Sequence, residues 1–360
     1  MFEITGKNGH GGNIWAASQK WGIAPENIID FSASINPLGP SARAIEAIQA
    51  NLGMLEHYPE PRGESFNSIL ASYLGIDSAN LVLGNGGLEL IYLLGRMFYY
   101  NRIVVLAPCF SEYGEGLEQP RIYRINLDRE DGFKLPLERI LNEIQENDLI
   151  FIANPNNPTG NLFAREELLA IIKRAADKDS LVVVDEAFQD FIEDKGLSLV
   201  DQVEKNKNLV VIGSLTKFFA LPALRLGYGV AHKEGILEME HLLPTWRINS
   251  LALVAAAASV NHREYIEATF KTIKSEKEFL MQGLAEFSGL KVYPGASNFI
   301  LVEAEKYGFS AQELQELLGP MGILIRKCDN FYNLSHFFFR LAIKKRQANQ
   351  TLLKALRIVL

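Results

Sequence analysis

The sequence predicts an α/β protein with two unequal parts: a large domain built on a mostly parallel sheet of the seven-stranded type covered by helices, and a smaller α+β domain. Two observations predict this. Short, continuous apolar runs alternate with segments of helical periodicity through the middle of the chain. After residue 249 the pattern changes to longer helices and a few strands. Continuous β-branched runs between helices are typical of parallel strands that are buried on both faces.

In the large domain, the apolar runs predict strands and the helical periodicity predicts the helices between them. The expected strands are residues 81–83, 103–106, 149–152, 181–184, 209–212 and 226–231. The expected helices are residues 88–100, 135–144, 165–176 and 236–243. In such sheets, ligands bind beyond the carboxyl ends of the strands.

In the smaller domain, helices are expected over residues 251–260 and 264–287. Strands follow at 297–302, 323–326 and 337–343, and a closing helix at 347–356. The Gly/Asn-rich start of the chain predicts an arm. The expected organisation is therefore an arm of residues 1–37 packed on the small domain, a large domain of residues 38–247 and a small domain of residues 248–360.

Composition excludes several classes of protein. The net charge of −7 gives no basic surface for nucleic acid. Two cysteines, Cys109 and Cys328, are too few for a disulfide framework or a zinc cluster, and no metal site is expected. The first 30 residues lack a signal-peptide core, and the apolar run 251–260 is about half a membrane span. A cytoplasmic protein without a membrane partner is the expectation.

The most informative motif follows the expected strand 209–212. Ser214 and Thr216 precede Lys217, and Arg225 follows eight positions later. A lysine that forms a Schiff base must be neutral, so its pKa has to fall from roughly 10.4. A cofactor phosphate needs hydroxyl groups and a guanidinium group. The motif predicts a pyridoxal phosphate (PLP) site with Lys217 as the Schiff-base lysine, although each residue alone could be an ordinary surface side chain.

Other strand ends carry matching side chains. Asp185 ends a buried strand, where it could pair with a protonated pyridine nitrogen or simply cap the next helix. Asn157 lies in the Asn-Pro-Asn-Asn-Pro-Thr-Gly loop at 154–160, where its amide could bind the cofactor's phenolate oxygen or only serve the turn.

A glycine turn at 84–87 precedes the helix expected from Leu88, so the backbone N–H groups at Gly86, Gly87 and Leu88 could bind a phosphate. Phe110 follows another strand and could stack on the pyridine ring, with Tyr113 as the alternative. Tyr58 could reach a cofactor phosphate across a dimer interface, or be an ordinary loop tyrosine.

Two arginines lie inside apolar strands of the small domain. Arg340 follows three phenylalanines, and Arg326 ends the run 323–326. A buried arginine needs an anion, and two arginines could bind the α-carboxylate and a second anionic group of a substrate. A structural ion pair would explain either residue equally well.

These residues together resemble fold-type I PLP enzymes over nearly the whole chain. The resemblance is carried by 154–160, Asp-Glu-Ala at 185–187, Ser-x-Thr-Lys at 214–217, Arg225 and Arg340. Within that superfamily the chain is similar to the histidinol-phosphate aminotransferase group, and most to its decarboxylating branch, the L-threonine-O-3-phosphate decarboxylases of cobalamin biosynthesis. Three segments indicate that branch: the His-Gly-Gly-Asn motif at residues 10–13, the segment of residues 30–39, and the segment of residues 325–328.

The resemblance implies a homodimer with its active site at the interface, and decarboxylation of L-threonine O-3-phosphate. Transamination of histidinol phosphate is the alternative, and a non-catalytic PLP-binding module is a third. It implies that the substrate is bound by His10, Asn13, Asn36, Asn157, Arg326 and Arg340. Phe188 stands where many relatives have tyrosine, and Ser34 where the decarboxylases usually have asparagine.

Overall fold

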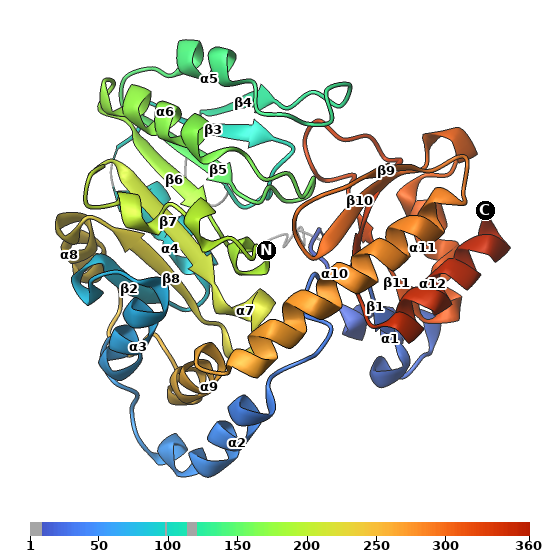
Figure 1. The fold of residues 1–360 in the computed structure, drawn as a ribbon, viewed down its shortest axis with the longest axis horizontal. Helices are drawn as coiled ribbons and strands as arrows, with labels where there is room; N and C mark the ends of the chain where they lie inside the picture. Colours follow the sequence, from blue (N-terminus) through green and yellow to red (C-terminus); the bar gives the residue numbers. More distant parts are fainter. Residues whose placement is uncertain (1–8, 98, 114–120) are drawn as a thin grey trace, which may run out of the picture.

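A seven-stranded sheet forms the centre of the large domain (Figure 1). The structure is a computed structural model that describes residues 9–97, 99–113 and 121–360. The strand order is β2-β8-β7-β6-β5-β3-β4, and only β8 runs antiparallel to its neighbours. The strands are β2 (Leu81–Gly84), β3 (Arg102–Ala107), β4 (Ile122–Asn126), β5 (Asp148–Ala153), β6 (Leu181–Asp185), β7 (Leu209–Ser214) and β8 (Gly227–Ala231).

Helices cover both faces of this sheet, because alternate residues of each strand point to opposite sides. Val183 and Ile212 face one side, where they join a core with α4 (Gly87–Met97) and α8 (Lys233–Leu242). Val182 and Val184 face the other side. There the covering helices are α3 (Glu64–Leu74), α5 (Leu137–Glu143), α6 (Arg165–Ala176) and α9 (Ser250–Val260). The predicted fold class is confirmed.

The small domain carries an antiparallel sheet in the order β12-β13-β10-β9. Its strands are β9 (Lys291–Tyr293), β10 (Phe299–Glu303), β12 (Arg326–Lys327) and β13 (Phe338–Ala342). The helices are α10 (Arg263–Ala285), α11 (Ala311–Leu318) and α12 (Arg346–Val359). The long helix α10 runs from the large domain to the small one (Figure 1).

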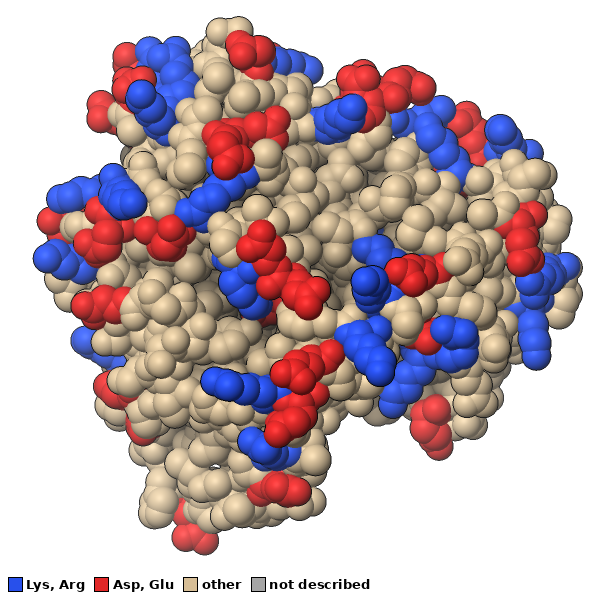
Figure 2. All heavy atoms as spheres, in the orientation of Figure 1, with Lys and Arg blue, Asp and Glu red and all other residues tan. Residues whose placement is uncertain are grey.

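The start of the chain adds to the small domain. Strand β1 (Ile29–Asp30) pairs in parallel with β11 (Ile323–Leu324), and α1 (Ile14–Trp21) precedes it. Helix α2 (Ala42–Ala50) then leads back to the large domain, where it packs on α9. No helix within the described ranges is long and apolar enough to cross a bilayer. On the face drawn in Figure 2, acidic and basic side chains are interspersed.

The expected strands and helices are present with shifts of a few residues at their ends, except that the strand expected at 323–326 is divided into β11 and β12, which belong to different sheets. The sequence did not predict α1, α2, α3, α7, α11, β1, β4 or β9. The carboxyl ends of β2, β3, β5, β6 and β7 lie at one edge of the sheet. The predicted site residues that follow these strands can therefore contribute to one site.

Candidate active site

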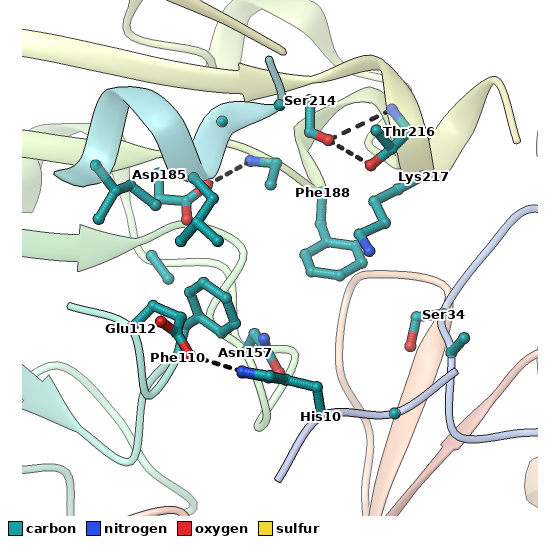
Figure 3. Close-up of a pocket in the computed structure, with 18 of the residues that line it drawn as sticks. His10, Ser34, Phe110, Glu112, Asn157, Asp185, Phe188, Ser214, Thr216 and Lys217 are labelled. Atoms are coloured by element: carbon teal, nitrogen blue, oxygen red, sulfur yellow. Dashed lines mark hydrogen bonds and ion pairs between the residues drawn. The ribbon is translucent and has the colours of Figure 1, made fainter. Parts of the chain in front are cut away.

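A cavity of about 390 Å³ lies at this edge of the sheet, between the two domains and the arm. It is lined by strand-end residues of the large domain, by Arg326 and Arg340 of the small domain, and by His10 and Gly11 of the arm. Figure 3 shows His10 of the arm and the strand-end residues Asp185, Asn157 and Lys217 of the large domain around this cavity. The cavity is therefore closed only when all three parts of the chain are in place.

Lys217 reaches into the cavity from α7 (Leu215–Phe218), the short helix that follows β7 (Figure 3). Burial and the positive charges of Arg340 and Arg225 together lower the pKa of its amine to about 8. A much larger fraction of the amine is therefore neutral near physiological pH than in an ordinary lysine, which favours its use as a nucleophile.

Asp185 lies at the end of β6, on the opposite wall from Lys217. Its Oδ1 accepts from the Ala187 N–H at 2.9 Å, and the Tyr113 hydroxyl donates to its Oδ2 at 2.6 Å. Burial raises the pKa of this carboxyl, while both hydrogen bonds oppose the rise. A buried carboxylate fixed in this way needs a cationic partner in the cavity.

Tyr113 was considered as an alternative to Phe110 for stacking on the cofactor ring. The structure gives it another contact, because its hydroxyl binds Asp185 and its ring stacks on Phe151 with centroids 5.0 Å apart. Phe110 lines the cavity and is half-buried. Phe110 remains the stacking candidate, and Tyr113 holds Asp185 in place.

One end of the cavity has the groups that a phosphate needs. Ser214 and Thr216 have hydroxyl oxygens 2.7 Å apart at the start of α7. Gly86, Gly87 and Leu88 line the cavity at the start of α4, where the first N–H groups of a helix have no partner within the helix. The Gly86 N–H donates to the Gly84 carbonyl at 2.7 Å, so Gly87 and Leu88 are the better placed of the three predicted phosphate donors.

Arg225 lies beside this turn. A side chain at Gly86, which has φ of +80°, would come within 2.7 Å of the Arg225 Nη2 atom, so glycine permits the close approach. Arg225 itself has φ of 56°, a conformation that non-glycine residues adopt at a cost. The guanidinium group of Arg225 thus lies beside the glycine turn, at the phosphate end of the cavity.

The small domain supplies the other wall. Arg326 and Arg340 are paired directly across β12 and β13, and both are buried. Burial lowers the pKa of Arg340 to about 10. Arg340 donates to the Asn157 Oδ1 atom and to the Ser32 carbonyl, and its Nε is buried with no hydrogen-bond partner in the described part of the chain. Neither arginine forms an ion pair with a carboxylate among the described residues, so anions can bind here.

Three predicted site residues, Asn13, Asn36 and Tyr58, do not line the cavity. Asn13 is exposed and caps α1, where its Oδ1 accepts from the Ala16 N–H at 3.0 Å. Asn36 is buried, with its amide donating to the Phe218 carbonyl and to the Thr269 hydroxyl. These contacts are structural, so the substrate-binding role expected for Asn13 and Asn36 does not fit this structure.

Tyr58 is 80% exposed and stacks on Trp246, with ring centroids 4.8 Å apart. It does not line the cavity of its own chain. This position agrees with both expectations for Tyr58, an ordinary loop tyrosine or a residue that serves a neighbouring subunit, and the second stays a prediction.

Sequence reasoning missed Glu112 and Ser32, which both line the cavity. Glu112 accepts hydrogen bonds from His10 and Tyr92, and Ser32 contacts the arm and Arg340. A carboxylate two residues after Phe110 was the only available signal for Glu112, and it resembles any surface glutamate. Phe188, placed beside Lys217 in Figure 3, offers no hydroxyl group to a cofactor.

Together the fold and these groups define a PLP-dependent enzyme of fold type I: a lysine with a lowered pKa, a buried aspartate opposite it, and an end suited to a phosphate. When bound, PLP acts as an electron sink for charge that develops at the substrate α-carbon. The chain belongs to the aminotransferase class I and II family, whose model matches residues 26–356.

Individual relatives refine the comparison. A threonine-phosphate decarboxylase of Salmonella typhimurium is 35% identical over 98% of this chain and 96% of its own length. A histidinol-phosphate aminotransferase of Methanocaldococcus jannaschii is 30% identical over 95% of this chain and 92% of its own length. The crystal structure of the histidinol-phosphate aminotransferase from Clostridium acetobutylicum has a TM-score of 0.85 at 31% identity, covering 91% of this chain and 98% of its own. The protein is therefore a PLP-dependent enzyme that is similar to both groups.

Proposed function

We propose that the protein decarboxylates L-threonine O-3-phosphate to (R)-1-aminopropan-2-yl phosphate, a reaction of cobalamin biosynthesis. The observation that carries the proposal is the pair of buried arginines, Arg326 and Arg340, on one wall of the cavity. Two adjacent guanidinium groups without carboxylate partners favour a substrate with two anionic groups. The full-length similarity to a threonine-phosphate decarboxylase supports the choice.

In this proposal the two arginines have separate ligands. Arg340 binds the α-carboxylate, since it lies beside Asn157 and has an unused Nε donor. Arg326 binds the phosphate from the neighbouring strand, with Nη2 bonded to Asn330 at 2.8 Å. His10 closes the cavity from the arm side. The substrate then spans the space between Lys217 and the small domain.

The large-domain residues perform the chemistry. Asp185 would pair with the protonated ring nitrogen of the cofactor. Phe110 would stack on the ring, and Asn157 would bind its phenolate oxygen. Lys217 would hold the cofactor and could donate the proton that replaces carbon dioxide at the α-carbon. Arg340 would orient the substrate carboxylate so that carbon dioxide rather than the α-proton is lost.

We also infer a homodimer in which Tyr58 reaches the cofactor phosphate of the neighbouring subunit. Tyr58 and Leu55 are 80% and 71% exposed on the same short stretch. Exposed apolar side chains that lie close together are typical of an interface.

The alternative is transamination of histidinol phosphate, which the similarity to histidinol-phosphate aminotransferases supports. That substrate carries a phosphate but no carboxylate. It would use one arginine for its own anion and leave the second for the carboxylate of the amino acceptor.

One assay separates the two. The purified enzyme with PLP is given O-phospho-L-threonine without any oxo acid, and carbon dioxide and aminopropanol phosphate are measured. The proposal expects both products in equal amounts. No product here, together with turnover of histidinol phosphate that requires 2-oxoglutarate, would establish the aminotransferase instead. O-phospho-L-serine serves as the specificity control, because one methyl group contributes only about 1–3 kcal/mol of discrimination.

A further inference from the structure

Glu112 is a buried carboxylate in the cavity lining for which the proposed chemistry has no role. It lies in the loop after β3, and two side chains from other parts of the chain bind it. His10 of the arm donates from Nε2 to Oε1 at 2.6 Å. Tyr92 of α4 donates its hydroxyl to Oε2 at 2.5 Å. Both carboxylate oxygens are therefore engaged, and Figure 3 shows the His10 contact.

The contact with Glu112 determines which nitrogen of His10 remains available. An ionised carboxylate only accepts hydrogen bonds, so the proton of the imidazole resides on Nε2. Nδ1 is left for another ligand. The ring also lies near Phe110, with centroids 5.9 Å apart, and its side chain is 48% exposed. His10 is thus fixed in direction at the outer rim of the cavity.

The same stretch of the arm is attached to the opposite wall. The Gly12 N–H donates to the Ser32 hydroxyl at 2.8 Å. A side chain at Gly11 would come within 2.2 Å of the Ser32 carbonyl, so the arm lies directly against this residue. The Ser32 carbonyl also accepts from Arg340 Nη2 at 3.2 Å. The arm therefore bridges the cavity from Arg340 on one side to Glu112 on the other.

We propose that Glu112 is a positioning residue that holds His10 at the mouth of the cavity so that Nδ1 faces the phosphate of the substrate, with Tyr92 orienting Glu112. The inference rests on the proposed function to the extent that the substrate is a phosphorylated amine or amino acid. A single proton between Nδ1 and a phosphate oxygen completes the contact, whether the imidazole or the phosphate supplies it.

If Glu112 has this role, only ligands that carry a phosphate should depend on Glu112 for their binding. An unphosphorylated ligand gains nothing from His10, so loss of Glu112 should leave its binding unchanged. Removal of His10 alone would leave Glu112 facing the phosphate as an unshielded negative charge. Removal of Glu112 in addition should relieve that repulsion.

The test compares Glu112→Gln, Tyr92→Phe, His10→Ala and the double variant His10→Ala/Glu112→Gln in the PLP-loaded enzyme. O-phospho-L-threonine, histidinol phosphate and L-threonine are compared by calorimetry where the ligand is not turned over, and by KM and kcat where it is. Glu112→Gln should weaken binding of the phosphorylated ligands about tenfold, the size of one charge-assisted hydrogen bond. L-threonine binding, kcat and the absorption spectrum of the bound cofactor should stay within about twofold of the wild type. The double variant should bind phosphorylated ligands no more weakly than His10→Ala.

The control is Glu316→Gln, which removes another carboxylate that binds the arm, through Lys20 at 2.5 Å, but lies away from the cavity. It should bind all three ligands as the wild type does. The inference is overturned if Glu112→Gln binds phosphorylated ligands normally, if it weakens L-threonine equally, or if the losses in the double variant simply add. Failure of the proposed function would appear separately, as wild-type enzyme that binds O-phospho-L-threonine without releasing carbon dioxide.

Discussion

At the residue scale, the site depends on placing a lysine where its charge is unfavourable. Lys217 is surrounded by protein and lies near two arginines, and these surroundings bring the pKa of its amine to about 8. The folded chain therefore destabilises the protonated lysine in order to keep a nucleophile available. Lys217 should therefore lower the free energy of unfolding of the cofactor-free protein.

Replacement of Lys217 by Met should stabilise the cofactor-free protein. The pKa of Lys217 in the folded protein lies below the ordinary lysine value of 10.5, so its full cost to stability is present below pH 8 and disappears as the pH rises to 10.5. Lys217→Met should raise the free energy of unfolding by roughly 2–3 kcal/mol at neutral pH and by much less near pH 10. Urea unfolding at both pH values measures this. Lys205→Met, at an exposed lysine, is the control; a gain that is equal at the two pH values would contradict the explanation.

Some residues of the candidate site could be predicted from the sequence and others could not. Lys217, Asp185 and Asn157 could be identified because each lies in a short motif after a strand, where neighbouring residues indicate the chemistry. Glu112 and Tyr113 could not be assigned, because their partners His10 and Asp185 are 102 and 72 positions away in the chain. Their roles arise only when the fold brings those segments together.

At the element scale, the short helix α7 is held in place from the arm. The Asn36 N–H donates to the Lys217 carbonyl at 3.0 Å, and its side chain binds Phe218 and Thr269 of α10. One buried asparagine thus ties together the arm, α7 and the helix that joins the two domains. This explains why it does not line the cavity although the family resemblance implied that it binds the substrate.

Asn36→Ala should lower the free energy of unfolding by about 2–4 kcal/mol, because two buried hydrogen bonds and one partly buried hydrogen bond are lost and the Phe218 carbonyl loses this donor. The kcat should fall more than KM rises, since α7 carries Lys217. Asn51→Ala, which removes one bond within a surface turn, is the matched control. A large rise in KM at unchanged stability would instead indicate direct contact with the substrate.

The strands that the sequence missed are either short or only partly buried. Strand β1 has two residues and β9 three, too few to show a period of two. Strand β4 lies at the edge of the sheet and is only partly buried, so its apolar pattern is weak. The buried strands β5, β6 and β7 were identified because their apolar runs are continuous.

At the scale of the whole molecule, the exposed stack of Tyr58 on Trp246 predicts that active sites are shared between subunits. A mixture of Lys217→Ala and Tyr58→Ala chains tests this. If Tyr58 serves the partner's site, one site in each mixed dimer has both native residues, and random mixing restores about a quarter of wild-type activity. Each variant mixed with wild-type chain is the control, and sedimentation gives the oligomeric state. No restoration in a mixture proven to contain mixed dimers would show that Tyr58 does not act across the interface.

The central claim is that this site breaks the bond between the α-carbon and the carboxylate, and the most direct measurement follows the hydrogen at that carbon. The enzyme with PLP is incubated with O-phospho-L-threonine in D₂O without an oxo acid, and the product is examined by NMR. The account predicts aminopropanol phosphate with one deuterium at the former α-carbon, because a solvent-derived proton replaces carbon dioxide. Recovery of O-phospho-L-threonine that has exchanged its α-hydrogen for deuterium but kept its carboxylate would contradict the account.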